Sequence, residues 1–229
     1  MNKKKFPLRI HLEELRRRLQ ICIFTTIIFS LLCYIYWPVI LSLITINKIN
    51  LIYISPQEAF IVRIKVSLIC GVLSSAPIIL YEIWEFLKPA LTSREKKLTI
   101  AIGMVSSVLF YAGIFFNIFF VTPFVVNFFI KTYQPVLTPL ISISNYTSFL
   151  VKMTTAFALV SQIPMLMVLG TVLGIINSGQ LIEYRQITIL VIFVIAAVLT
   201  PPDALSQLAL ALPMWGLYEL GLLLIKYVK

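Results

Sequence analysis

The chain has 229 residues, of which 60% are hydrophobic and only 12% are charged, and its mean hydropathy is +0.98. An ordinary soluble domain contains roughly a quarter charged residues and could not bury this much apolar surface. The composition therefore excludes a soluble protein and predicts an integral membrane protein. The net charge of +10 does not indicate a nucleic-acid-binding protein, because the basic residues form no stripe with aromatic residues between them.

Charge-free stretches predict the membrane helices. The longest three, 19–47, 98–130 and 153–182, each exceed the roughly 20 residues that a helix needs to cross a bilayer. Together with three shorter stretches they predict an all-α fold of six transmembrane helices in a single domain, residues 1–229. We expect these helices near residues 20–43, 67–87, 98–122, 149–174, 187–201 and 204–225.

The lysines and arginines orient the predicted helices. Fourteen of the 19 lie before the first helix, in the second or fourth connection, or after the last helix, and five lie on the opposite side. Positively charged loops stay on the side of the membrane where synthesis occurs, so both termini are predicted on the inner side. Six helices satisfy this arrangement, because it requires an even number.

The segments outside the spans also carry patterns. Leu8–Cys22 has apolar residues at helical spacing with charges between them, which is typical of an amphipathic helix that lies at the membrane surface and runs into the first span. The outer connections 44–66 and 131–148 are long and apolar, and we expect them to form structured caps.

Four prolines lie inside the predicted spans and are expected to kink them. Each proline removes one backbone hydrogen bond of its helix. Kinked helices would favour a curved wall over a straight bundle, although prolines are common in membrane helices generally. These prolines are Pro77, Pro123, Pro164 and Pro213.

The residue types needed for catalysis are missing from the spans. The one histidine, His11, lies in the basic leader, and Asp203 is the sole aspartate. A nucleophilic triad needs a base such as histidine, and intramembrane proteolysis needs two aspartates. With no glycine-rich phosphate loop and no metal-ligand spacing among the three cysteines, the sequence predicts a binding protein without cofactor or metal, and no enzyme.

Two glutamates are the best candidates for binding. Glu14 and Glu95 lie at the predicted inner membrane surface, within mostly basic segments. A carboxylate held there can pair bidentately with an incoming guanidinium group. Alternatively, each glutamate neutralises a neighbouring arginine, such as Arg16, Arg17 or Arg94.

One polar side chain is predicted in the middle of a span. Gln162 stands beside Pro164, and in hydrocarbon it needs a hydrogen-bonding partner or a water-filled cavity. It either bonds a neighbouring helix or has a functional role. Near the end of the second helix, the aromatic residues Tyr81, Trp84 and Phe86 are typical of an interfacial belt.

Several segments, in order from about residue 8 to 225, resemble the TatC family, which comprises the receptor subunits of the twin-arginine protein translocase. The segments that carry the resemblance are His11-Leu12-Glu13-Glu14-Leu15-Arg16, Tyr81-Glu82-Ile83-Trp84-Glu85-Phe86, Pro89-Ala90-Leu91 with Glu95, Thr200-Pro201-Pro202-Asp203 with Ser206-Gln207, and Pro213 with Tyr218 and Glu219.

This resemblance implies a concave, glove-like six-helix fold that recognises twin-arginine signal peptides on folded cargo and uses the proton-motive force. Glu14 and Glu95 match the family's arginine-binding positions, Arg16 and Phe86 match further residues of that signal-peptide-binding site, and Asp203 matches an acidic residue of the outer side. The implied partners are signal peptides, small single-span Tat subunits of the TatA and TatB kind, and further copies of the chain. The implied location is an energy-transducing membrane, either bacterial or organellar.

Gln162 departs from the family pattern, because many relatives have a glutamate there. A role in anchoring a partner helix would then have to use neutral hydrogen bonds. Two other functions stay open at this point: a secondary transporter of a small solute, which would need a polar cavity at mid-membrane, and a structural subunit of a respiratory complex.

Overall fold

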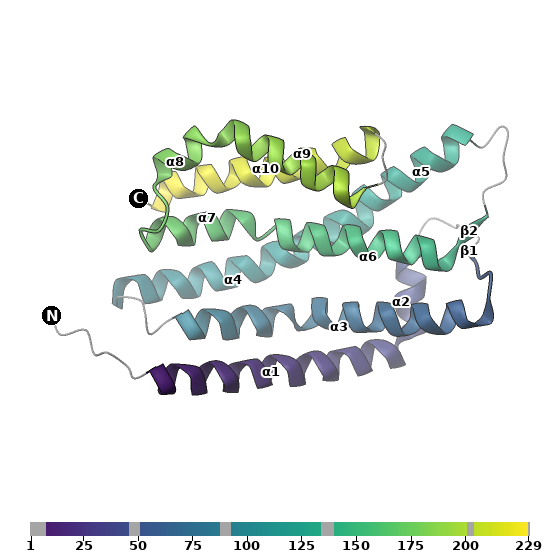
Figure 1. Cartoon of the computed structure of the whole chain (residues 1–229), viewed down its shortest axis with the longest axis horizontal. Helices are drawn as coiled ribbons and strands as arrows, with labels where there is room; N and C mark the ends of the chain where they lie inside the picture. Colours follow the sequence, from purple (N-terminus) through teal and green to yellow (C-terminus); the bar gives the residue numbers. More distant parts are fainter. Residues whose placement is uncertain (1–7, 46–50, 88–92, 134–139, 201–203, 229) are drawn as a thin grey trace.

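The computed structural model describes residues 8–45, 51–87, 93–133, 140–200 and 204–228, which are helical apart from short connections and two short strands (Figure 1). In chain order the elements are α1 (Leu8–Ile35), α2 (Trp37–Ile44), β1 (Leu51–Ile52), α3 (Pro56–Leu87), α4 (Ser93–Phe116), the π-helical turn η2 (Asn117–Val121), α5 (Thr122–Tyr133), β2 (Ile141–Ser142), α6 (Ile143–Val160), α7 (Ile163–Val172), α8 (Ser178–Glu183), α9 (Arg185–Leu199) and α10 (Ala204–Val228).

Five helical stretches among the described residues are long and apolar enough to cross a membrane. They are Leu12–Ile35, Pro56–Phe86, Ile102–Lys131, Ile143–Val172 and Ala204–Lys226. The fifth predicted helix, near residues 187–201, corresponds to α9, whose 15 residues extend about 22 Å, short of the roughly 30 Å hydrocarbon core. The prediction of an all-helical protein with several membrane spans is confirmed. The amphipathic N-terminal segment is also helical and continues directly into the first span as part of α1.

The predicted start of the second span, near residue 67, is wrong. Helix α3 begins at Pro56 and takes Arg63 and Lys65 into its first turns, residues that we had assigned to a connection. Both cations have partners there. The Arg63 guanidinium lies 4.0 Å from the ring centroid of Tyr34 and donates to the Tyr34 carbonyl over 3.0 Å, and Lys65 Nζ donates to Ser148 Oγ over 3.1 Å. A charge near a helix end is tolerated when it is paired in this way.

The prolines interrupt some spans but not others. The fourth span breaks between α6 and α7, and Pro164 lies in the first turn of α7. Backbone N–H groups in the first turn of a helix have no intrahelical acceptor, so the N–H that proline lacks costs no hydrogen bond there. Pro123 follows the π-helical turn Asn117–Val121, which joins α4 to α5. By contrast, α3 continues through Pro77 and α10 continues through Pro213. A break or a π-helical turn therefore lies beside two of the four prolines, and the helix continues through the other two.

The unit of α6 and α7 lies at the centre of the protein. In the most apolar 18-residue window of this unit, 61% is buried inside the protein, whereas only 6% of the corresponding window of α1 is buried. Phe157 and Met153 of α6 are fully buried in a core shared with α4, α7 and α10. Helix α1 packs almost entirely on α3, so its other faces are exposed. Exposed apolar side chains on a membrane helix are suited to lipid.

The start of α1 and the end of α10 lie at the same end of the protein, here called the terminal end (Figure 1). At the opposite, distal end, β1 pairs in parallel with β2. Glu58 reinforces this pairing, since its carboxylate accepts from the Ile54 amide over 2.7 Å, from the Ser144 amide over 3.1 Å and from the Ser142 hydroxyl. The two connections predicted to form structured caps therefore bind each other through their described parts.

Small and hydroxyl-bearing residues bring α1 and α3 together. Thr26 Oγ1 and Ser75 Oγ share a hydrogen bond of 3.1 Å, and Ser30 Oγ lies 3.5 Å from the Leu68 carbonyl oxygen. Gly71 faces the backbone of Ser30 so closely that a Cβ atom there would lie 2.6 Å from the Ser30 Cα. Close backbone approach at small residues is a common way for membrane helices to associate. It fixes how the two helices meet at the terminal end.

Candidate functional site

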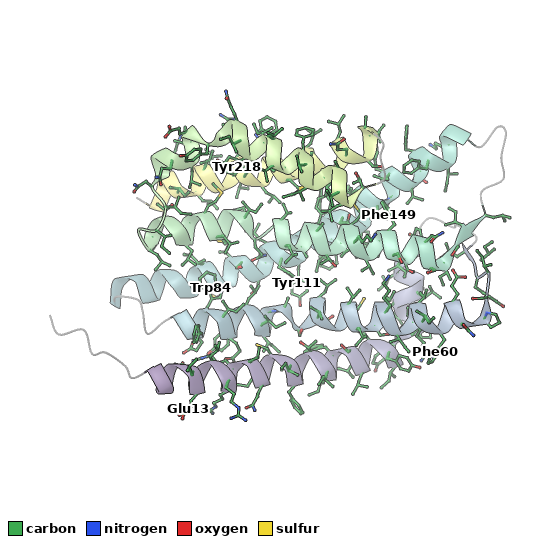
Figure 2. All side chains as sticks on the ribbon, in the orientation of Figure 1. Glu13, Phe60, Trp84, Tyr111, Phe149 and Tyr218 are labelled. Atoms are coloured by element: carbon green, nitrogen blue, oxygen red, sulfur yellow. The ribbon has the colours of Figure 1, made fainter. Side chains whose placement is uncertain are left out.

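A cleft of about 640 Å³ lies between α1 and α3 at the terminal end, where Figure 2 places Glu13. We call it the acidic cleft. Its lining residues are Glu13, Glu14, Arg17, Arg18 and Ile21 of α1, and Tyr81, Glu82 and Glu85 of α3.

Helical spacing explains why these residues share one cleft. On an α-helix, residues three or four positions apart lie on the same face. The α1 residues recur at such intervals from Glu13 to Ile21, as do Tyr81 and Glu85 of α3. Because α1 and α3 pack side by side along their length, these two polar faces oppose each other just beyond the apolar part of the interface.

An arginine bridges the two helices inside the cleft. Arg18 donates to Glu14 Oε1 from Nη2 over 2.7 Å and from Nε over 3.1 Å, and its Nη1 donates to Glu82 Oε2 over 2.9 Å. The side chains of Arg18, Glu14 and Glu82 are 18%, 30% and 12% exposed. Such charge-assisted bonds are stronger than neutral ones, and partial burial limits their screening by salt.

The cleft is rich in charged groups. Among the described residues, the carboxylates of Glu13, Glu14, Glu82 and Glu85 and the guanidinium groups of Arg17 and Arg18 line it. Glu14 and Glu82 hold the Arg18 guanidinium group between them. Carboxylates from two helices can thus enclose one planar guanidinium group, the cation whose geometry suits them best.

The predicted site residues fall in different places. Glu14 lines the acidic cleft, whereas Arg16 is exposed on α1 outside its lining and Phe86 is half-buried near the end of α3. Glu95 belongs to the first turn of α4, which begins at the terminal end (Figure 1), and its side chain lies outside the described residues. Asp203 also lies outside the described residues.

The sequence interpretation missed three contributors, Arg18, Glu82 and Glu85. The four-residue interval from Glu14 to Arg18 could have indicated their pairing, because oppositely charged residues at this spacing meet on a helix. No local pattern could have indicated Glu82 as the second partner, since it lies 64 positions from Arg18 in the chain.

Gln162 bonds a neighbouring helix of the same chain. Its Nε2 donates to the Ser106 carbonyl of α4 over 3.1 Å, and its Oε1 accepts from the Ser106 hydroxyl. Both residues are buried. The junction of α6 and α7 is thereby attached to α4. A second buried amide, which the sequence interpretation overlooked, makes a similar link: Asn117 in the π-helical turn donates to Thr154 Oγ1 of α6 over 2.8 Å.

Replacing Gln162 with leucine is expected to lower the free energy of unfolding by about 1 kcal/mol, because the Ser106 hydroxyl loses its acceptor in a buried place. Thermal unfolding of the solubilised protein measures this effect, with Leu159→Ala as the control at an exposed position nearby. The double variant Gln162→Leu with Ser106→Ala should lose less than the sum of the single losses. Equal stability of Gln162→Leu and the unaltered protein would contradict this role.

The last helix is held at the terminal end by two polar contacts. Tyr218 of α10 donates to the Leu181 carbonyl of α8 over 2.5 Å (Figure 2 labels Tyr218), and Glu219 pairs with Arg185 at the start of α9 over 2.5 Å. Trp215 Nε1 also donates to Glu219 over 3.0 Å. These residues, two of which carried the family resemblance, thus have a structural role in joining α8, α9 and α10.

Comparison with known proteins supports one family throughout. Residues 10–213 match the family model described as "Sec-independent protein translocase protein (TatC)". The TatC protein of Carboxydothermus hydrogenoformans is 34% identical over 234 aligned residues, which cover 100% of this chain and 96% of that protein. The TatC protein of Helicobacter pylori is 34% identical, with 97% of this chain and 88% of that protein covered.

Solved structures agree with the sequence relatives. A crystal structure of the twin arginine translocase receptor TatC in DDM superposes with a TM-score of 0.84 at 33% identity, covering 93% of this chain and 98% of that one. The translocase family accounts for the whole described fold, which removes the reason to consider a solute transporter or a respiratory subunit. The chain is a multi-pass integral membrane protein that belongs to the TatC family, the receptors of the twin-arginine translocase, and it is not an enzyme.

Proposed function

We propose that the acidic cleft, together with Glu95 at the start of α4, binds the paired arginines of a twin-arginine signal peptide. The observation that supports this site best is that the cleft already holds one guanidinium group, that of Arg18, between the carboxylates of Glu14 and Glu82. Glu14 and Glu95 each receive one guanidinium group of the peptide, and Arg16 and Phe86 contribute to the same surface. Two carboxylates on different helices suit two consecutive arginines, because each guanidinium group presents a planar set of donors.

The terminal end faces the inner side of the membrane in this proposal. The excess of lysines and arginines in the segments at that end supports this orientation. With its arginines at the membrane surface, the peptide lays its apolar part along the lipid-facing wall of a concave, glove-like bundle. The exposed apolar face of α1 beside the cleft supports this path. The single membrane domain works in an energy-transducing membrane, bacterial or organellar, and the proton-motive force supplies the energy.

Small single-span Tat subunits of the TatA and TatB kind, and further copies of the receptor, complete the translocase. A partner helix has a place to bind in an apolar hollow of about 340 Å³ between α4, α6 and α10, which reaches Ser161 next to Gln162. Because Gln162 itself bonds Ser106, the partner contacts apolar residues of the hollow, such as Phe116 and Leu217. Asp203 acts on the outer side.

A crosslinking experiment tests the proposed ligand. A signal peptide with a photoreactive group next to its arginine pair is added to the purified full-length receptor in detergent, and a peptide with two lysines in place of the arginines serves as the control. We expect the arginine peptide to crosslink at least about tenfold more, since a difference of 1.4 kcal/mol in binding is tenfold. Equal crosslinking of the two peptides would reject arginine recognition.

A further inference from the structure

Arg18 and its two partners show how a guanidinium group fits into the acidic cleft. Its three nitrogen atoms are all used: Nε and Nη2 bind Glu14 on α1, and Nη1 binds Glu82 on α3. A lysine ammonium group also has three donors, but they radiate from one nitrogen atom and cannot reproduce the planar spread of the three guanidinium nitrogens. The pair of Glu14 and Glu82 is therefore built for a guanidinium group, and in the free receptor this group belongs to the chain itself.

We propose that Glu82 is an arginine-specificity residue of the receptor. With Glu14 it forms a guanidinium seat, which Arg18 fills in the free receptor and which one arginine of the signal peptide takes on binding. This inference rests on the proposed function, because it assumes that a signal-peptide arginine enters the acidic cleft. It assigns a ligand-binding carboxylate to α3, beyond Glu14 and Glu95.

Charge explains why Arg18 leaves only in exchange for another cation. The seat is half-buried, so departure of Arg18 alone would leave two carboxylates unpaired next to each other, which is costly. Exchange of one guanidinium group for another keeps the charge and the number of hydrogen bonds the same. The displaced Arg18 remains in a cleft that Glu13 also lines, and its long side chain can keep the charged end in water.

The exchange gives Arg18 the effect of an internal competitor. Any ligand whose donors do not match the planar arrangement of those of Arg18 binds less well than Arg18 does, and a lysine is such a ligand. The seat therefore favours arginine over lysine in two ways, by its own geometry and by the competitor that already occupies it.

The alternative is that Arg18 and Glu82 only brace α1 against α3. The two explanations predict opposite signs for one substitution, Arg18→Gln. A brace is lost equally in Arg18→Gln and in Glu82→Gln, so both would weaken ligand binding. In our proposal, Glu82→Gln weakens binding because the seat loses a carboxylate, whereas Arg18→Gln strengthens it because the competitor is gone and both carboxylates await a cation.

Peptide affinity of the purified full-length receptor provides the test, with a fluorescent twin-arginine peptide and its twin-lysine counterpart as probes. We expect Glu82→Gln to weaken arginine-peptide binding about tenfold and to reduce the preference over the lysine peptide, and Arg18→Gln to strengthen binding about threefold or more. Glu183→Gln, which removes one exposed carboxylate of α8 at the same end, is the charge control and should change neither value. Glu82→Asp replaces this test if Glu82→Gln fails to fold. It keeps the charge but withdraws it by one methylene group, and it should also weaken binding.

A loss of affinity in both Arg18→Gln and Glu82→Gln, or no change in either, would overturn the seat while leaving the proposed function intact. Failure of the unaltered receptor to prefer the arginine peptide would instead reject the proposed function itself.

Discussion

Replacing Gly71 with alanine is expected to separate α1 from α3 and to weaken ligand binding at the acidic cleft. The added Cβ atom would lie 2.1 Å from Ser30 Oγ, 2.6 Å from Ser30 Cα and 2.6 Å from the Ser30 nitrogen. Rotation of the serine side chain relieves only the first of these overlaps. The other two involve backbone, so α1 itself must move. Overpacking of this kind costs typically about 1–3 kcal/mol.

The movement reaches the cleft because α1 packs almost entirely on α3. Glu14 and Glu82 lie on these two helices, and the Arg18 guanidinium group spans both carboxylates over 2.7 and 2.9 Å, so a small shift moves the carboxylates too far apart to share one guanidinium group. We expect a fall in Tm of roughly 2 to 12 °C and a loss of twin-arginine peptide binding. Gly216→Ala on α10 is the matched control, since a Cβ atom there meets no atom within 4 Å. If Gly71→Ala and Gly216→Ala were equally stable, the close approach of α1 and α3 would not be essential.

Replacing Glu14 or Glu95 with glutamine is expected to reduce crosslinking of a twin-arginine precursor by at least about tenfold. Glutamine keeps the size of the side chain but removes its charge. Hydrogen bonds to charged groups contribute about 1.5–3 kcal/mol, which corresponds to roughly 10- to 150-fold in affinity. For Glu14 the loss is expected to be large, because this carboxylate accepts two of the three hydrogen bonds that hold the Arg18 guanidinium group in the cleft and that an incoming arginine would take over.

The receptor must remain inserted for this result to be informative. Protease accessibility of the connections in membrane vesicles, compared between each variant and the unaltered receptor, tests insertion. Glu183→Gln again provides the charge control at the terminal end. Unchanged crosslinking in both the Glu14 and Glu95 variants would remove these residues from the binding site.

Hydropathy predicted an all-helical protein with several membrane spans, because in lipid only long apolar helices satisfy their own backbone. Of the six predicted helices, five are long enough to cross a membrane and one, α9, is shorter. Hydropathy failed at the start of α3, where a charge-free stretch begins later than the helix does. The rule treats every cation as an interruption, whereas Arg63 stacks on Tyr34 and bonds its carbonyl. Pairs between helices are not visible in a hydropathy window.

The aromatic residues near the end of α3 show the same limit. Tyr81 is 59% exposed and fits the interfacial belt predicted for this segment. Trp84, three positions later, is instead buried in the core beside Ile102 of α4, and a Cβ atom at Gly103 would lie 3.0 Å from its ring. Helical geometry turns the two side chains to different faces, and only the packing of α4 decides which face is buried.

For the site, residue type and position along the chain made Glu14 one of two candidates, and the resemblance to the TatC family favoured a binding role over neutralisation of a neighbouring arginine. They could not show that Arg18 pairs with Glu14 and Glu82 together. The sequence offered Arg16 and Arg17 as neighbours that Glu14 might neutralise. The arginine that pairs with Glu14 is Arg18, the residue after Arg17, which lies one helical turn from Glu14. This contact depends on how α1 lies against α3.

The most direct test of the central claim, that carboxylates between α1 and α3 capture the paired arginines of a signal peptide, is to map the crosslink. A photoreactive residue beside the arginine pair is crosslinked to the full-length receptor, and the attachment site is identified by mass spectrometry of the digested product. Our account predicts attachment within α1 around Glu14 to Ile21 and within α3 around Tyr81 to Glu85. Attachment at the distal end, near β1 and β2, would contradict it.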